Sequence, residues 1–133
     1  MKMLIVDDDQ FSRSLLQKML APYGECQVAV NGEEGLTAVT TAMQQESAPY
    51  QLICLDIMMP EIDGLQCLQE IRALERKFAV TGAQRAKIVM TTAVDSMKSV
   101  MEAYAKGGCD AYLVKPFTQE ALLSTLRTCG LTP

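Results

Sequence analysis

The side chains best suited to chemistry are an acidic run, Asp7–Asp9, and three residues far apart in the chain, Asp56, Thr92 and Lys115. Carboxylates brought close together repel one another, and a bound cation removes that cost. Carboxylate oxygens are the hard ligands that Mg²⁺ prefers. A carboxylate beside such a cation can attack phosphorus and form an acyl phosphate, while a lysine and a hydroxyl hold the phosphoryl oxygens. The residue types therefore predict phosphoryl transfer to Asp56 with Mg²⁺ as the cofactor.

The chain contains no histidine. This absence excludes His-based metal sites, Ser–His and Cys–His catalysis, and a phosphohistidine on this chain. A phosphoryl group for Asp56 would therefore have to come from another molecule.

The composition is that of an ordinary folded domain, with 133 residues, 49% hydrophobic and 21% charged. A net charge of −4 argues against direct binding of nucleic acid or anionic membrane. The five cysteines are odd in number and form no Cys-x-x-Cys pair, which favours reduced thiols. There is no signal peptide, and no apolar run approaches the roughly 20 residues of a membrane helix, so a cytoplasmic location is expected.

Short apolar runs alternate with segments of helical period, a pattern typical of an α/β fold with a parallel sheet. Strands are expected at Met3–Val6, Gln27–Val30, Leu52–Leu55, Ile88–Thr91 and Ala111–Val114. Apolar residues at helical spacing mark a helix after each strand, for example Leu15 and Leu16, Leu36 and Val39, Leu65 and Leu68, Met97, Met101 and Tyr104, and Leu122 and Leu126. The sequence thus predicts five strands and five helices in strict alternation.

The chemically active residues all follow strands. Asp7–Asp9 comes after the first strand, Asp56 after the third, Thr92 after the fourth and Lys115 after the fifth. Ligands of open α/β sheets bind just outside the carboxyl ends of the strands. We therefore expect these side chains to converge at one edge of the sheet.

Four segments, taken together and in this order, resemble the motifs of response-regulator receiver domains of two-component signalling. They are Leu4–Asp8, Leu55–Pro60 with Asp63–Gly64, Thr91–Ala93 and Val114–Phe117. The resemblance implies a single receiver domain over residues 1–133, with a core at about 3–126. It also implies a (βα)5 doubly wound fold, in which a five-stranded parallel sheet has the flavodoxin-like order 2-1-3-4-5 and helices on both faces.

The resemblance assigns the metal and phosphoryl chemistry residue by residue. Asp56 resembles the phosphoacceptor. Asp8 would bind Mg²⁺ directly, Asp7 through water, and the Met58 backbone carbonyl would be a further ligand, with Mn²⁺ as a substitute for Mg²⁺. Lys115 resembles the lysine that contacts the phosphoryl group.

The resemblance also names a switch pair, Thr92 and Tyr112. The Thr92 hydroxyl would turn toward the phosphoryl group, and the Tyr112 ring would move inward behind it. The Lys115–Pro116 peptide resembles one that is often cis, which would position Lys115. Three residues have structural positions at the site: Pro60, Gly64 and Pro116.

By resemblance the chain is a signalling switch and not an enzyme, catalysing only its own phosphorylation and dephosphorylation. A sensor histidine kinase or a His-containing phosphotransfer protein would donate the phosphoryl group. Phosphorylation would change the affinity for a downstream protein at the face formed by the fourth helix, fifth strand and fifth helix. The state is expected to be a monomer or a dimer promoted by phosphorylation, either as a stand-alone regulator or as a receiver cut from a longer protein.

Two other functions stay open at this point. One is a receiver-like docking module that never carries phosphate. The other is a phosphatase with an aspartyl nucleophile, for which the Asp-x-Asp spacing of Asp7 and Asp9 is a superficial match.

Two features depart from the family pattern. In the family, polar residues often occupy the positions at which this chain has the apolar Met58 and Val94. We expect these two side chains to hinder the water that hydrolyses the acyl phosphate and so to lengthen the lifetime of the acyl phosphate.

The connection Glu75–Lys87 is long and basic, and the connection before the third strand is also long. These are either tolerated surface insertions or contacts for a specific partner.

Overall fold

The structure is a computed structural model that describes residues 1–45, 49–106 and 108–131. Its strands are β1 (Lys2–Val6), β2 (Glu25–Ala29), β3 (Leu52–Asp56), β4 (Lys87–Thr92) and β5 (Ala111–Val114). Its α-helices are α1 (Gln10–Leu20), α2 (Gly32–Gln44), α3 (Gly64–Lys77), α4 (Met97–Ala105) and α5 (Gln119–Thr128). Three short 3-10 turns are η1 (Ala21–Tyr23), η2 (Gly82–Gln84) and η3 (Val94–Ser96). Within the described residues, the predicted alternation of strands and helices is confirmed.

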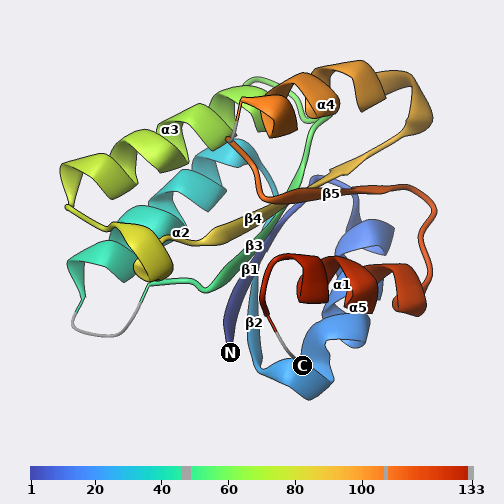
Figure 1. The fold of residues 1–133 in the computed structure, drawn as a ribbon, viewed down its shortest axis with the longest axis horizontal. Helices are drawn as coiled ribbons and strands as arrows, with labels where there is room; N and C mark the ends of the chain where they lie inside the picture. Colours follow the sequence, from blue (N-terminus) through green and yellow to red (C-terminus); the bar gives the residue numbers. More distant parts are fainter. Residues whose placement is uncertain (46–48, 107, 132–133) are drawn as a thin grey trace.

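The five strands form one sheet in the order β2-β1-β3-β4-β5, and every neighbouring pair is parallel (Figure 1). This confirms the expected order. Strand β2 pairs with one edge of β1, and β3 pairs with the other edge. The carboxyl ends of β1 and β3 therefore flank the switch point at which open α/β sheets bind ligands.

The helices cover both faces of the sheet, as expected. Figure 1 shows α2, α3 and α4 on one face and α1 and α5 on the other. Each layer buries its own apolar cluster, which includes Val39, Ile71 and Val100 on the first face and Leu16 and Leu122 on the second. The central strand β3 is buried at every residue, because helices cover it from both sides.

Side-chain caps set where the helices begin. The N-cap residues Asp9, Asn31, Asp63 and Thr118 each accept a hydrogen bond from a backbone N–H of the first helical turn. Such a cap stabilises a helix by about 1 kcal/mol. Asp9, to which the sequence analysis gave no role, is thus the residue that starts α1 directly behind the end of β1.

Strands β1, β3 and β4 differ from their expected ranges by at most one residue at either end, and two element boundaries differ by more. Strand β2 occupies Glu25–Ala29 rather than Gln27–Val30, because it is an edge strand whose exposed residues carry little apolar pattern. Helix α3 continues to Lys77, so Glu75 belongs to the helix and not to the following loop. The Glu75 carboxylate is buried there and pairs with the buried Arg72 and the exposed Arg85, and these contacts hold the last helical turn in place.

The expected apolar face of α4 is only partly right. Val100 is fully buried, whereas Met101 and Tyr104 are exposed. The long connection expected before the third strand falls partly outside the described residues. No helix in the described part of the chain is long and apolar enough to cross a membrane.

Candidate functional site

Three carboxylates meet at the carboxyl ends of β1 and β3. Asp7 and Asp8 follow β1, Asp56 is the last residue of β3, and carboxylate oxygens of all three lie within 4.8 Å of one another. Asp7 and Asp56 are buried, with 1% and 5% of their surface exposed, while Asp8 is exposed. The predicted acidic cluster is therefore formed, and it is open to solvent on the Asp8 side.

Lys115 connects this cluster to the end of β5. Its Nζ donates to Asp7 Oδ2 at 3.0 Å and to Asp56 Oδ1 at 3.3 Å. Burial alone would lower the pKa of Lys115, but the hydrogen bond to Asp7 and the charge of Asp56 raise it on balance. The ammonium group is therefore held in its charged form between the two carboxylates.

The surroundings of Asp56 disfavour its ionisation. Burial, followed by the negative charge of Asp7, raises the pKa of Asp56 to about 6, and the Lys115 ammonium only partly offsets this. A low-dielectric setting with a like charge nearby opposes ionisation. The three carboxylates of the cluster face a single ammonium group, that of Lys115, so the cluster lacks the positive charge needed to balance them.

The donor set fits a hard divalent cation. Three carboxylates with one open side offer oxygen ligands and leave room for water, which is the environment that Mg²⁺ favours. A cation there would also remove the repulsion that raises the pKa of Asp56. Asp7, Asp8 and Asp56 could hold Mg²⁺; the roles of each of them and of the Met58 carbonyl stay predictions.

Thr92 lies at the end of β4 and is fully buried. Its hydroxyl donates to the carbonyl oxygen of Ala93 at 2.9 Å. The backbone N–H of Lys115 donates to the Thr92 carbonyl at 2.7 Å, which fixes the end of β5 beside that of β4. Thr92 is thus next to the Lys115 backbone, while its hydroxyl is engaged locally.

Tyr112 lies in β5 and is partly buried. Its ring packs edge-on against Tyr104 of α4, with centroids 5.9 Å apart and an interplanar angle of 76°. Such aromatic pairs are worth about 0.5–1.5 kcal/mol beyond their buried area. This pairing was not predicted from the sequence. Because the two rings are in contact, any movement of Tyr112 would have to break or carry along the contact with Tyr104.

The loop after β3 depends on Gly64. A Cβ at this position would come 2.6 Å from Ile57 Cα, so only glycine allows the start of α3 to approach the end of β3. The Gly64 N–H donates to the Ile57 carbonyl at 2.9 Å. Pro60 is exposed in the same loop. The Lys115–Pro116 peptide bond is cis, as the resemblance implied.

One residue at the site was missed. Arg13 donates from Nη1 to the Asp7 carbonyl oxygen at 2.9 Å. It lies in the first turn of α1, and side chains of a helix tilt toward its N-terminus, here toward the end of β1. A cationic residue in the turn that follows the acidic run was the signal available in the sequence.

Comparison with known proteins agrees with this geometry. Residues 3–127 match the family model described as the response regulator receiver domain. The chain is 32% identical to the chemotaxis protein CheY of Listeria monocytogenes over 126 residues, which covers 95% of both chains. Both observations show that this chain belongs to the response regulator receiver domain family.

Solved structures show the same fold. The chemotaxis protein CheY4 of Vibrio cholerae is similar with a TM-score of 0.73 and 30% identity, over 95% of both chains. The receiver domain of the histidine kinase CKI1 from Arabidopsis thaliana, complexed with Mg²⁺ and BeF₃⁻, has a TM-score of 0.79 and 27% identity, over 97% of this chain and 89% of that one. The protein is thus a receiver domain of the two-component signalling family, and receiver domains act as signalling switches.

Proposed function

We propose that this chain is a phosphorylation switch that accepts a phosphoryl group on Asp56 in a Mg²⁺-dependent reaction. The observation that carries the proposal is the contact of one ammonium group, Lys115 Nζ, with both Asp7 and Asp56 inside an acidic cluster. The donor would be a phosphohistidine of a sensor histidine kinase or of a His-containing phosphotransfer protein. The absence of histidine from the chain is in keeping with a donor on another molecule.

In the transfer step, a carboxylate oxygen of Asp56 attacks phosphorus. An oxygen–phosphorus bond forms, the bond from phosphorus to the donor imidazole nitrogen breaks, and that nitrogen leaves with the electron pair. Lys115 would exchange its contact with Asp56 for one with a phosphoryl oxygen. Mg²⁺, held by Asp7, Asp8, Asp56 and the Met58 carbonyl, would supply positive charge that offsets the charge on the phosphoryl oxygens.

The switch would begin at Thr92. Its hydroxyl now donates to the Ala93 carbonyl, and a phosphoryl oxygen on Asp56 would offer a more strongly charged acceptor. Movement of Thr92 would open space for Tyr112, whose ring packs against Tyr104. Only interactions that differ between the two states can shift their equilibrium, and this exchange of acceptors is such a difference.

The output surface would be the face formed by α4, β5 and α5. Two exposed apolar side chains of α4, Met101 and Tyr104, lie on this part of the molecule, with 51% and 46% of their surface exposed. Because Tyr104 contacts Tyr112, a change at Tyr112 would alter that surface. Phosphorylation would therefore change the affinity for a downstream protein or for a second copy of the chain.

The experiment is intact-mass measurement after incubation with acetyl phosphate and Mg²⁺. A single phosphoryl adduct is expected in the wild type and is expected to be absent in Asp56→Asn and in the presence of EDTA. Circular dichroism of each sample verifies that it is folded. No adduct on folded wild-type protein would overturn the proposal in favour of a docking module that carries no phosphate.

A further inference from the structure

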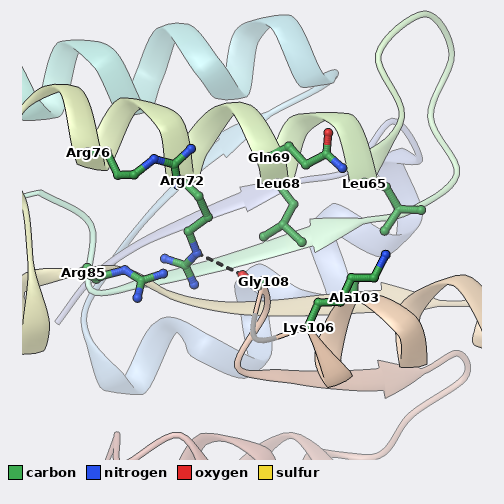
Figure 2. Close-up of a pocket in the computed structure, with 9 residues that line it drawn as sticks. All are labelled: Leu65, Leu68, Gln69, Arg72, Arg76, Arg85, Ala103, Lys106 and Gly108. Atoms are coloured by element: carbon green, nitrogen blue, oxygen red, sulfur yellow. Dashed lines mark hydrogen bonds between the residues drawn. The ribbon is translucent and has the colours of Figure 1, made fainter.

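A pocket lies apart from the acidic cluster, between α3 and the end of α4. Figure 2 shows it lined by side chains of α3 from above, by Lys106 and Ala103 from below, and by Arg85 of the connection between α3 and β4. Its volume is about 330 Å³, which is within the range of small-molecule sites. None of the residues proposed for phosphoryl transfer lines it.

The lining combines an apolar floor with basic walls. Leu65, Leu68 and Ala103 supply the floor. The protein has a net charge of −4 and only 12 lysines and arginines, yet four of these basic side chains line this one pocket, and no lining residue is acidic. Such a concentration of positive charge on an acidic protein indicates an anionic ligand.

Two of the four cations are neutralised within the protein. Arg72 donates to Glu75 at 2.7 Å, to Asp110 at 2.9 Å and to the carbonyl oxygens of Ala86 and Gly108. Arg85 contacts the same Glu75 oxygen at 3.4 Å. The two guanidinium groups are thus held side by side by Glu75, with Asp110 as a second counter-charge. This network makes one wall of the pocket rigid.

The other two cations carry the excess charge. Among the described residues, neither Arg76 nor Lys106 has an ion-pair partner within 4.0 Å. Glu102, one turn before Lys106 on α4, is exposed and forms no such pair among those residues either. Figure 2 shows Arg76 at one end of the pocket and Lys106 reaching toward the end near Leu65. A bound anion would therefore find two unneutralised cations on opposite elements.

We propose that this pocket binds a mononucleotide, with the phosphate at Arg76 and the base over the apolar floor toward Lys106. Guanidinium groups bind phosphate through paired N–H donors and stack on planar rings, so the arginine walls suit both parts of such a ligand. Gln69 adds an amide donor and acceptor at the rim for the base edge. The inference is independent of phosphorylation of Asp56.

Calorimetric titration of the full chain with AMP in EDTA tests the proposal, because EDTA removes any metal that could hold phosphate at the acidic cluster. Saturable binding is expected, weakened about tenfold or more in the double variant Arg76→Ala/Lys106→Ala. The matched control is Lys18→Ala/Lys98→Ala, which removes two exposed lysines outside the pocket and should bind as the wild type does. Asp56→Asn should also keep its affinity, which separates this inference from the proposed function.

Location is tested by methyl chemical shifts. AMP should shift the signals of Leu68 and Ala103 and leave that of Thr92 unchanged, and Ala103→Leu, which fills the pocket without changing charge, should abolish binding. Adenosine and inorganic phosphate are the further probes and should each bind more weakly than AMP. The proposal is overturned if AMP does not saturate, if either probe equals AMP, or if the lysine control weakens binding as much as the pocket variant.

Discussion

Lys115 Nζ donates to Asp7 Oδ2 at 3.0 Å, although 108 residues separate them in the chain. The contact joins the end of β5 to the end of β1, and the same ammonium also reaches Asp56. Among the described residues, Lys115 is the only basic side chain that forms ion pairs with the acidic cluster. The first prediction concerns its removal.

Substitution Lys115→Ala should slow phosphorylation of Asp56 by acetyl phosphate by about tenfold or more, because a charge contact with the transferring group is lost. The measurement is the rate at which the phosphoryl adduct appears in the intact-mass spectrum at saturating Mg²⁺. Lys98→Ala, an exposed lysine of α4, is the matched control. An unchanged rate in Lys115→Ala would remove this residue from the transfer step.

Stability without metal should depend on the ionisation of Asp56. Burial and the charge of Asp7 raise its pKa to about 6, whereas an unfolded aspartate titrates near 3.9. The folded protein therefore holds this proton more tightly than the unfolded chain does. The stability that the proton supplies is lost as the pH rises through about 6.

In EDTA, the free energy of unfolding of the wild type should thus fall by on the order of 1 kcal/mol relative to that of Asp56→Asn between about pH 5 and pH 7. This value is reduced for solvent screening. Urea denaturation of both proteins at each pH gives the difference. Addition of Mg²⁺ should shrink it, since a cation offsets the repulsion. If the unfolding free energies of the two proteins in EDTA depend on pH in the same way, the raised pKa of Asp56 is contradicted.

The lifetime of phospho-Asp56 should depend on Met58 and Val94. Both side chains are exposed, at 66% and 71%, and neither can hydrogen-bond a water. The double variant Met58→Asn/Val94→Glu should therefore lose the phosphoryl group faster, by about tenfold if an aligned water recovers typical general-base or positioning assistance. Decay of the adduct after removal of acetyl phosphate is the readout. Met101→Asn, on α4, serves as the control, and an unaltered decay rate in the double variant would refute the idea.

Arg72 should be essential for stability. Its side chain is 8% exposed and pairs with Glu75, which is 2% exposed, and with Asp110. Arg72→Met would leave the buried Glu75 carboxylate with only the longer, 3.4 Å contact to Arg85 as an ion pair, at a cost of about 3–5 kcal/mol of unfolding free energy. Adding Glu75→Gln should recover part of this loss, because it removes the stranded charge. Urea denaturation measures both, and a loss below about 1 kcal/mol in the single variant would show that water replaces Arg72.

The convergence of Asp7, Asp56 and Lys115 could be predicted from sequence for a physical reason. Strand-forming runs are local patterns, and residues that follow parallel strands must meet at one edge whatever the side-chain packing. The need for Gly64 also has a local cause, the close approach of α3 to β3. Both features can therefore be predicted even when the expected strand boundaries contain small errors.

Other features could not be read from the sequence because they depend on packing between distant elements. The Arg72 network joins α3 to two later connections, and its buried charges look like surface charges in a linear pattern. The same holds for α4, where Val100 rather than Met101 faces the core. Spacing alone does not determine which of several adjacent apolar residues a short helix buries.

The sheet order also has a consequence for synthesis of the protein. Asp7 and Asp56 belong to neighbouring central strands, whereas Lys115 arrives with the edge strand β5, 108 residues after Asp7. At translation rates of about 5–20 residues per second, the acidic cluster, which Asp56 completes, emerges from the ribosome roughly 3–12 s before its lysine. During that interval a nascent chain lacks the counter-charge, so the full rate of phosphate acceptance would be reached only when the last strand docks.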